Sequence, residues 1–296
     1  RGIPISYSVN YTYFCPMFWK IARYSLFFLL SLVFLSCGEY QKVLKDTDIT
    51  RKYEYAQKLY DEGDFKKANR LFEQIAPQFV GKPQGERVMF FFANSYFEIG
   101  DYNFAGYQFE RFLKSYPRSD KAAEAAFLGA KSYYMLSPKY SLDQTDTDKA
   151  LTKLQLFINS YPESEYTVEA NEMARELTTK KEQKAFEIAK QFVKLGEYYV
   201  LDYNLSGIAA LDNFVNDYPG SVFREEALFQ KFRATSNLAI NSTFRKRKER
   251  LDEAMEAYNN LIKNYPETEI LKDADKILED IQDELNKYTE LENLAK

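Results

Sequence analysis

The sequence predicts an all-α protein: a right-handed helical solenoid of about five helix pairs, followed by a single C-terminal helix. Three observations lead to this prediction. A tetrapeptide, Tyr-Pro-x-Ser/Thr, occurs four times in the 296-residue chain. Small and apolar residues stand at the same distances from each copy, with the spacing of one helix face. Residues 267–296 are charged but carry apolar residues at helical intervals, as expected for a helix that caps the last repeat.

The first element is a segment that we expect to be removed. Residues 1–36 contain an apolar run from Tyr24 to Leu35, with Lys20 and Arg23 just before it. Those twelve residues would rise about 18 Å as a helix, too little for a bilayer core of about 30 Å. A short apolar run behind a basic flank indicates a secretory signal peptide. We expect Met17 to be the true start, which leaves the residues before it outside the protein.

The border between the signal and the polar chain is Ser36-Cys37. A small residue directly before a cysteine resembles a bacterial lipobox, where the cysteine after the cut carries acyl chains such as palmitate. Phe34 stands where the motif usually has leucine. We therefore expect lipidation of Cys37 and a lipidated tether over residues 37–48, since several acyl chains give stable anchoring. The alternative is an ordinary signal peptide followed by a buried free cysteine.

Composition argues against several classes of function. Without Arg1, Lys20 and Arg23, the chain from Cys37 onward has 37 basic and 44 acidic residues, a net charge of −7. An acidic chain is a poor candidate for binding nucleic acid. Histidine is absent, which removes the commonest general base and most zinc sites. We expect no enzyme, no metal and no cofactor; the enzymatic rival is a glycosidase that uses two carboxylates.

The repeated tetrapeptide is expected to end one helix and cap the next. Proline stops the helix before it, and the Ser or Thr can accept from the first N–H groups of the following helix. The four copies are Tyr116–Ser119, Tyr161–Ser164, Tyr218–Ser221 and Tyr265–Thr268. A degenerate fifth copy has Phe79 at the tyrosine position and its proline displaced to Pro77. Eleven residues before each of these five aromatic residues stands a small one: Ala68, Ala105, Ala150, Gly207 and Ala254.

The first two units, residues 49–118, have short turns. Gly63-Asp64-Phe65 and Gly100-Asp101-Tyr102 match the turn between the two helices of a tetratricopeptide repeat, which these units resemble. Such pairs cannot bury their apolar faces alone, so they stack into a solenoid.

Units three to five, residues 119–266, depart from that pattern. The third should have a long loop from Ser137 to Asp146, with Thr145 starting a capping box. The fourth should have either a long first helix over about 165–201 or an insertion near Gly196. We favour the long helix, because Asp202 then keeps the 16-residue distance to the motif tyrosine that Gly63 and Gly100 have to their motif aromatics. The fifth should turn near residues 241–243, before the basic run 245–250. The charged stretch 267–296 follows as the capping helix.

A lipobox followed by about five such units, with Tyr-Pro-x-Ser at successive unit ends, resembles the BamD family. Members are lipoproteins of the outer-membrane β-barrel assembly (BAM) machinery. The aromatic-rich, Asn- and Lys-rich composition suits a source of the Bacteroidetes type. The resemblance implies a non-enzymatic scaffold, lipid-anchored at the periplasmic face of the outer membrane.

The resemblance also implies two protein partners. The N-terminal units would receive unfolded outer-membrane protein clients, with groove candidates Tyr53, Tyr60, Phe91, Tyr96 and Tyr102. The region 200–285 would dock on the POTRA domains of the barrel-forming insertase, with candidates Asp212, Arg224, Arg233, Arg245 and Arg247. One departure is that residues 205–217 contain no Arg or Lys, where a basic contact is expected. The alternative is a tetratricopeptide lipoprotein that serves cell-wall synthesis or glycan capture.

Overall fold

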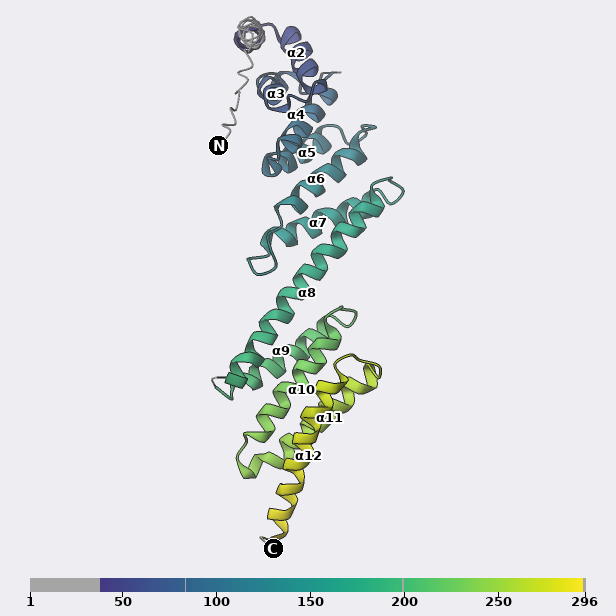
Figure 1. Ribbon diagram of the computed structural model, residues 1–296. Coiled ribbons are helices and arrows are strands. Elements are labelled where there is room, and N and C mark those ends of the chain that lie inside the picture. Colours follow the sequence, from purple (N-terminus) through teal and green to yellow (C-terminus); the bar gives the residue numbers. More distant parts are fainter. Residues whose placement is uncertain (1–37, 83, 199, 295–296) are drawn as a thin grey trace, which may run out of the picture.

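The computed structural model describes residues 38–82, 84–198 and 200–294; Cys37 and the signal segment lie outside them. Within these ranges the chain forms helices and no strand (Figure 1). Residues 38–45 are helical. The helices that follow are α2 (Ile49–Asp61), α3 (Phe65–Phe79), α4 (Gly85–Ile99), α5 (Tyr102–Ser115), α6 (Ala122–Leu136), α7 (Thr145–Ser160), α8 (Thr167–Tyr198), α9 (Tyr203–Asp217), α10 (Arg224–Ile240), α11 (Phe244–Asn264) and α12 (Leu271–Leu294).

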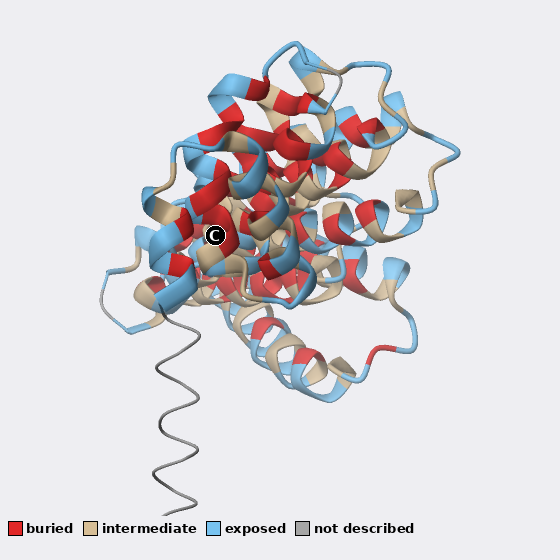
Figure 2. Cartoon of the chain, turned by 90° about the horizontal axis from the view of Figure 1, so that it is seen from above, coloured by how far each residue is buried: buried red, intermediate tan, exposed pale blue. Residues whose placement is uncertain are grey.

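The helices stack in chain order into an elongated solenoid. Each helix packs chiefly on its predecessor and its successor, so that α2/α3, α4/α5, α6/α7, α8/α9 and α10/α11 form pairs and α12 covers the last one. The described N-terminal end and the C-terminus lie at opposite ends of the stack (Figure 1). Viewed along the stack, buried residues face neighbouring helices, while most turn residues are exposed (Figure 2). The predicted all-α solenoid is confirmed.

The four Tyr-Pro motifs have one backbone conformation. Their tyrosines have φ between −138° and −127° and ψ between 59° and 71°. Each tyrosine N–H donates to the carbonyl four residues earlier, which closes the last turn, and proline is the first residue beyond. In three copies the tyrosine ring also packs on the phenylalanine four residues earlier, with centroids 5.3–5.8 Å apart. The motif therefore ends each helix as predicted.

The hydroxyl of each motif joins adjacent units. It accepts from the backbone N–H two residues later, as in Ser119, where the distance from Lys121 N is 2.9 Å. In three copies it also donates to a glutamate of the previous unit: Ser119 to Glu86, Ser221 to Glu182 and Thr268 to Glu225. One side chain thus caps the next helix and fixes the packing of two units.

The small residues of the pattern lie where helices approach most closely. Ala68, Ala105, Ala150 and Ala254 are fully buried. At Gly207 an added Cβ would lie 3.1 Å from the backbone nitrogen of Val193 in α8. A larger side chain at these positions would push the helices apart.

Two local predictions differ from the structure. Gln144, not Thr145, precedes the first residue of α7, so the predicted capping box is wrong. The Gln144 amide holds the preceding loop by donating to the carbonyls of Lys139 and Leu142, at 2.8 and 3.0 Å. Pro77 lies inside α3, which continues to Phe79; the helix of the degenerate copy therefore does not end at its proline.

The long helix predicted near 165–201 is confirmed as α8, with 32 residues. Its first part, to Leu177, packs in one hydrophobic cluster, and its last part, from Ala185, packs in another. No residue of 178–184 belongs to either cluster. This segment, which we call the joint, connects an N-terminal half to a C-terminal half.

The stretch predicted as a tether enters the core early. Tyr40 and Val43 are buried against the first helix pair. No helix in the described part of the chain is both long and apolar enough to cross a membrane.

Candidate binding surfaces

The predicted client residues lie on the first two units, where they make several separate ring contacts. The ring centroids of Tyr60 and Phe91 are 4.6 Å apart, and the Tyr60 hydroxyl accepts a hydrogen bond from Asn94. Burial raises the pKa of Tyr60 above its usual value. Both rings also contact the buried Phe72. This pair is therefore part of the wall of the core.

The other three predicted aromatics pack elsewhere. Tyr53 lies 5.9 Å from Phe79, and Tyr102 lies 5.5 Å from Phe97, between ring centroids. Tyr96 stacks on Phe104, at 5.4 Å. All three are half-buried, so each presents only part of its ring.

Two more exposed aromatics of this region are absent from the sequence prediction. Phe104 and Tyr107, both on α5, are 54% and 53% exposed, more than any predicted client residue. A helical projection could have found them, because α5 buries Ala105, Phe109 and Phe112 and these two rings lie beside that stripe. The exposed aromatic surface of the N-terminal half therefore includes α5.

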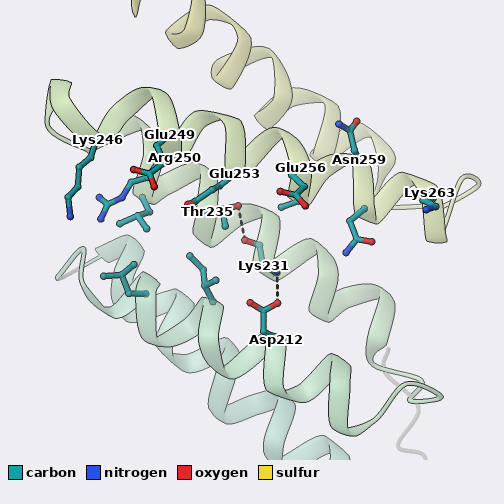
Figure 3. A pocket seen from close by; sticks show the side chains of 15 residues that line it. Asp212, Lys231, Thr235, Lys246, Glu249, Arg250, Glu253, Glu256, Asn259 and Lys263 are labelled. Atoms are coloured by element: carbon teal, nitrogen blue, oxygen red, sulfur yellow. Dashed lines mark hydrogen bonds and ion pairs between the residues drawn. The ribbon is translucent and has the colours of Figure 1, made fainter.

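An open groove of about 850 Å³ lies in the C-terminal half, between α9 and α11 with α10 as its floor (Figure 3). Asp212 on α9 and Lys231 on α10 form an ion pair of 2.5 Å across it. The α11 wall carries three acids, Glu249, Glu253 and Glu256, spaced four and three residues apart on one helix face. We call this the C-terminal groove.

Of the predicted docking residues, only Asp212 lines this groove. Arg224 donates to Asn264, at 3.3 Å. Arg233 pairs with Glu197, at 2.7 Å, and Arg247 donates to the carbonyl of Ser242. Arg245 is exposed, and the described residues offer it no ion pair.

The sequence analysis did not include the three glutamates of the groove, because the groove forms only when α9, α10 and α11 pack together. The regular spacing of the three acids on one face was nevertheless readable, whereas the position of Lys231 depends on how α9 and α10 pack.

A smaller cleft of about 210 Å³ occupies the equivalent place between α5, α6 and α7. Glu110 stands six residues before its motif tyrosine, as Asp212 does before Tyr218. It accepts from Lys153, at 2.8 Å, and from the Tyr133 hydroxyl, at 2.9 Å. Burial and this carboxylate raise the pKa of Tyr133 to about 12. The wall of this cleft is mostly apolar, so the two grooves suit different partners.

The fold and its surfaces define a class: a helical-repeat scaffold with binding grooves along its sides. Among the described residues no group of three or more Asp, Glu or Cys could hold a metal ion.

The comparisons with known proteins identify the family. A family described as "YfiO: Outer membrane lipoprotein" matches residues 45–201 and 196–292. The chain belongs to this family of outer membrane lipoproteins, whose members are non-enzymatic scaffolds.

No curated protein matches the sequence. One solved structure, titled "Computational Design of Self-Assembling Cyclic Protein Homooligomers", is 14% identical. The match covers 89% of this chain and 97% of that one, with a TM-score of 0.23. A likeness at this level indicates nothing about function.

Proposed function

We propose that the protein is a scaffold of outer-membrane β-barrel assembly, anchored at the periplasmic face by acyl chains on Cys37. The observation that carries the proposal is the family match, which spans nearly all described helices. A stack of helix pairs with separate surfaces in its two halves suits a protein that holds two partners at once. The lipobox-like Ser36-Cys37 supplies the anchor.

In this proposal the two halves have different partners. The aromatic surface of α2–α5 receives extended segments of unfolded barrel proteins, since aromatic rings offer large contact areas at little entropic cost. The C-terminal groove docks the POTRA domains of the insertase. Its lining mixes acids with the cations Lys231, Lys246, Arg250 and Lys263, so a partner surface with charges of both signs fits it through charge complementarity.

Depletion of the protein in cells tests the function. Loss of an assembly scaffold should lower the amounts of several unrelated outer-membrane barrels together, as measured by quantitative proteomics of the membrane fraction. Barrel amounts that hold while cell-wall synthesis or glycan uptake fails would contradict the proposal and favour the alternative partner.

Charge reversal tests the docking surface. Glu253→Lys with Glu256→Lys should reduce co-purification of the insertase about tenfold or more, because two attractive contacts become repulsive. Glu279→Lys is the matched control, since Glu279 is exposed on α12 outside the groove. Equal recovery from both variants would place docking elsewhere.

Replacement of the anchor residue tests lipidation. Cys37→Ser should abolish incorporation of labelled palmitate. Incorporation that persists in this variant would refute the lipobox assignment.

A further inference from the structure

Exposed apolar side chains gather at the turns within units three to five. These turns are residues 137–144, 200–202 and 241–243, and with the helix ends beside them they lie along one edge of the solenoid (Figure 1). We call this the turn edge. Its exposed apolar residues outside the C-terminal groove are Met135, Leu142, Tyr198, Val200, Tyr203 and Phe244.

The exposure of these side chains is large. Tyr198 is 70% exposed, Leu142 57% and Val200 51%. They protrude from turns, so they add nothing to the core of the stack. Apolar residues that cluster on an exposed surface mark a site that another apolar surface covers.

Cations stand at both ends of the turn edge. Lys139 lies in the first turn, and Arg245 and Lys246 follow Phe244 after the third; Lys246 also lines the C-terminal groove. All three are exposed, and none makes an ion pair within the described part of the chain. The acids of these turns are Asp143, which already accepts from the Thr145 N–H at 2.9 Å, and Asp202.

The turns between units have the opposite charge. In Figure 1 they lie along the other edge of the same region. Residues 161–166 and 265–270 carry four exposed glutamates and no cation, and residues 218–223 carry no charge. Exposed valines occur there too, Val168 and Val222. The two edges therefore differ in charge more than in apolar exposure.

We propose that the turn edge contacts a lipid surface with anionic headgroups. Protruding aliphatic and tyrosine side chains can enter the interfacial layer, where tyrosine is favoured, while flanking cations attract anionic headgroups. Three separate turns can meet a flat fluid surface together, whereas a partner protein would need matching hollows. The acidic edge then faces away from the lipid. The proposal rests on the membrane location given under Proposed function, not on a role in assembly.

Vesicle binding tests the proposal without the anchor. The chain from residue 37 onward, carrying Cys37→Ser, keeps every described helix. Its partition onto vesicles of phosphatidylethanolamine and phosphatidylglycerol is compared by co-sedimentation with that onto phosphatidylcholine alone. We expect binding to the anionic vesicles at least about fivefold stronger, since each basic residue contributes about that factor.

Paired substitutions locate the contact. Lys139→Glu with Arg245→Glu, and separately Leu142→Ser with Val200→Ser, should each weaken partition about tenfold. Val168→Ser with Val222→Ser, which are even more exposed and lie on the opposite edge, should change it less than about twofold. Thermal melting by circular dichroism confirms that each variant folds.

Two results overturn the proposal: no partition of the parent chain onto anionic vesicles, or equal weakening by the control pair. Loss of binding to a purified insertase by the turn-edge variants, with no vesicle binding in the parent, would assign the edge to a protein partner instead. None of these outcomes depends on the depletion experiment, so the two proposals can fail separately.

Discussion

At the scale of single residues, the Ser or Thr of the repeated motif links the local and tertiary structure. Its oxygen accepts from the start of the next helix, which stabilises a helix terminus that would otherwise lack a partner. Its proton goes to a glutamate of the previous unit in three of four copies. The sequence predicted the first contact from spacing alone. The second contact, with the glutamate, depends on how neighbouring units stack, so it could not be predicted from the sequence.

Ser119→Ala should destabilise the N-terminal half by about 1–2 kcal/mol, because it removes both the cap for Lys121 N and the donor to Glu86. Urea unfolding followed by circular dichroism measures the change. Ser141→Ala is the control, since Ser141 is exposed in a loop and should change stability by less than about 0.5 kcal/mol. Equal midpoints for the two variants would contradict a structural role for the hydroxyl.

The carboxyl of Glu110 should make stability depend on acid pH. Burial alone would raise its pKa, but hydrogen bonds from Lys153 and Tyr133 outweigh burial and hold the pKa below the ordinary 4.5. A carboxyl with a lower pKa in the folded chain stabilises the fold above its unfolded pKa. That contribution is lost as pH falls from about 4.5 through the folded value.

Glu110→Gln should therefore flatten the fall of urea midpoint between pH 5 and pH 3, while lowering the midpoint near neutrality. Parallel pH profiles for the parent and the variant would show that this carboxyl does not contribute.

At the scale of elements, the helix ends, α8 and the long loop before α7 were predictable, whereas the cap of α7 was not. In the sequence, the proline of each Tyr-Pro motif marks where the preceding helix ends. The preserved distance of Asp202 from the next tyrosine motif argued for one long helix, and Asp202 does precede α9. At the α7 start, a buried glutamine that gathers loop carbonyls replaced the expected threonine cap. These bonds reach back only two to five residues, but the usual cap patterns do not include a glutamine that accepts no N–H of its own helix.

Gly196 of α8 packs against the side chain of Asn204 at the start of α9. An added Cβ would lie 2.5 Å from the side chain of Asn204, which is fully buried. Gly196→Ala should therefore destabilise the C-terminal half by about 1–3 kcal/mol, although alanine favours helices. The urea midpoint measures it, with Lys194→Ala, an exposed position of the same helix, as control. A stabilised Gly196→Ala variant would show that the helices can separate without cost.

At the scale of the whole molecule, two stacked halves share one helix. The sequence predicted the number of pairs and the fold class, because each unit repeats the same stripe of small and apolar residues. It did not predict which side chains share a surface: of the docking candidates only Asp212 reached the C-terminal groove. Which side chains share a surface depends on how each unit is rotated relative to the others. That rotation is set by contacts between side chains that are far apart in the sequence.

The joint of α8 should bend without unfolding either half. Gln183→Pro removes a helix hydrogen bond and clashes with the preceding turn, at a cost of about 3 kcal/mol. Because both clusters lie outside residues 178–184, most helical signal in circular dichroism should remain, while small-angle scattering should report a changed maximum dimension. Gln183→Ala should match the parent in both. Collapse of the helical signal in the proline variant would mean that the halves fold as one unit.

Because α8 is one continuous helix, its length also sets the rotation of the C-terminal half relative to the N-terminal half. Each residue of an α-helix turns the chain by about 100° and advances it by about 1.5 Å. Removing one residue from the joint would rotate everything beyond it by more than a quarter turn, which would change the orientation of the C-terminal groove relative to the aromatic surface of α2–α5. Adding or removing seven residues would nearly restore the original orientation, because seven residues make almost two full turns. The length of α8 therefore fixes the relative orientation of the two surfaces.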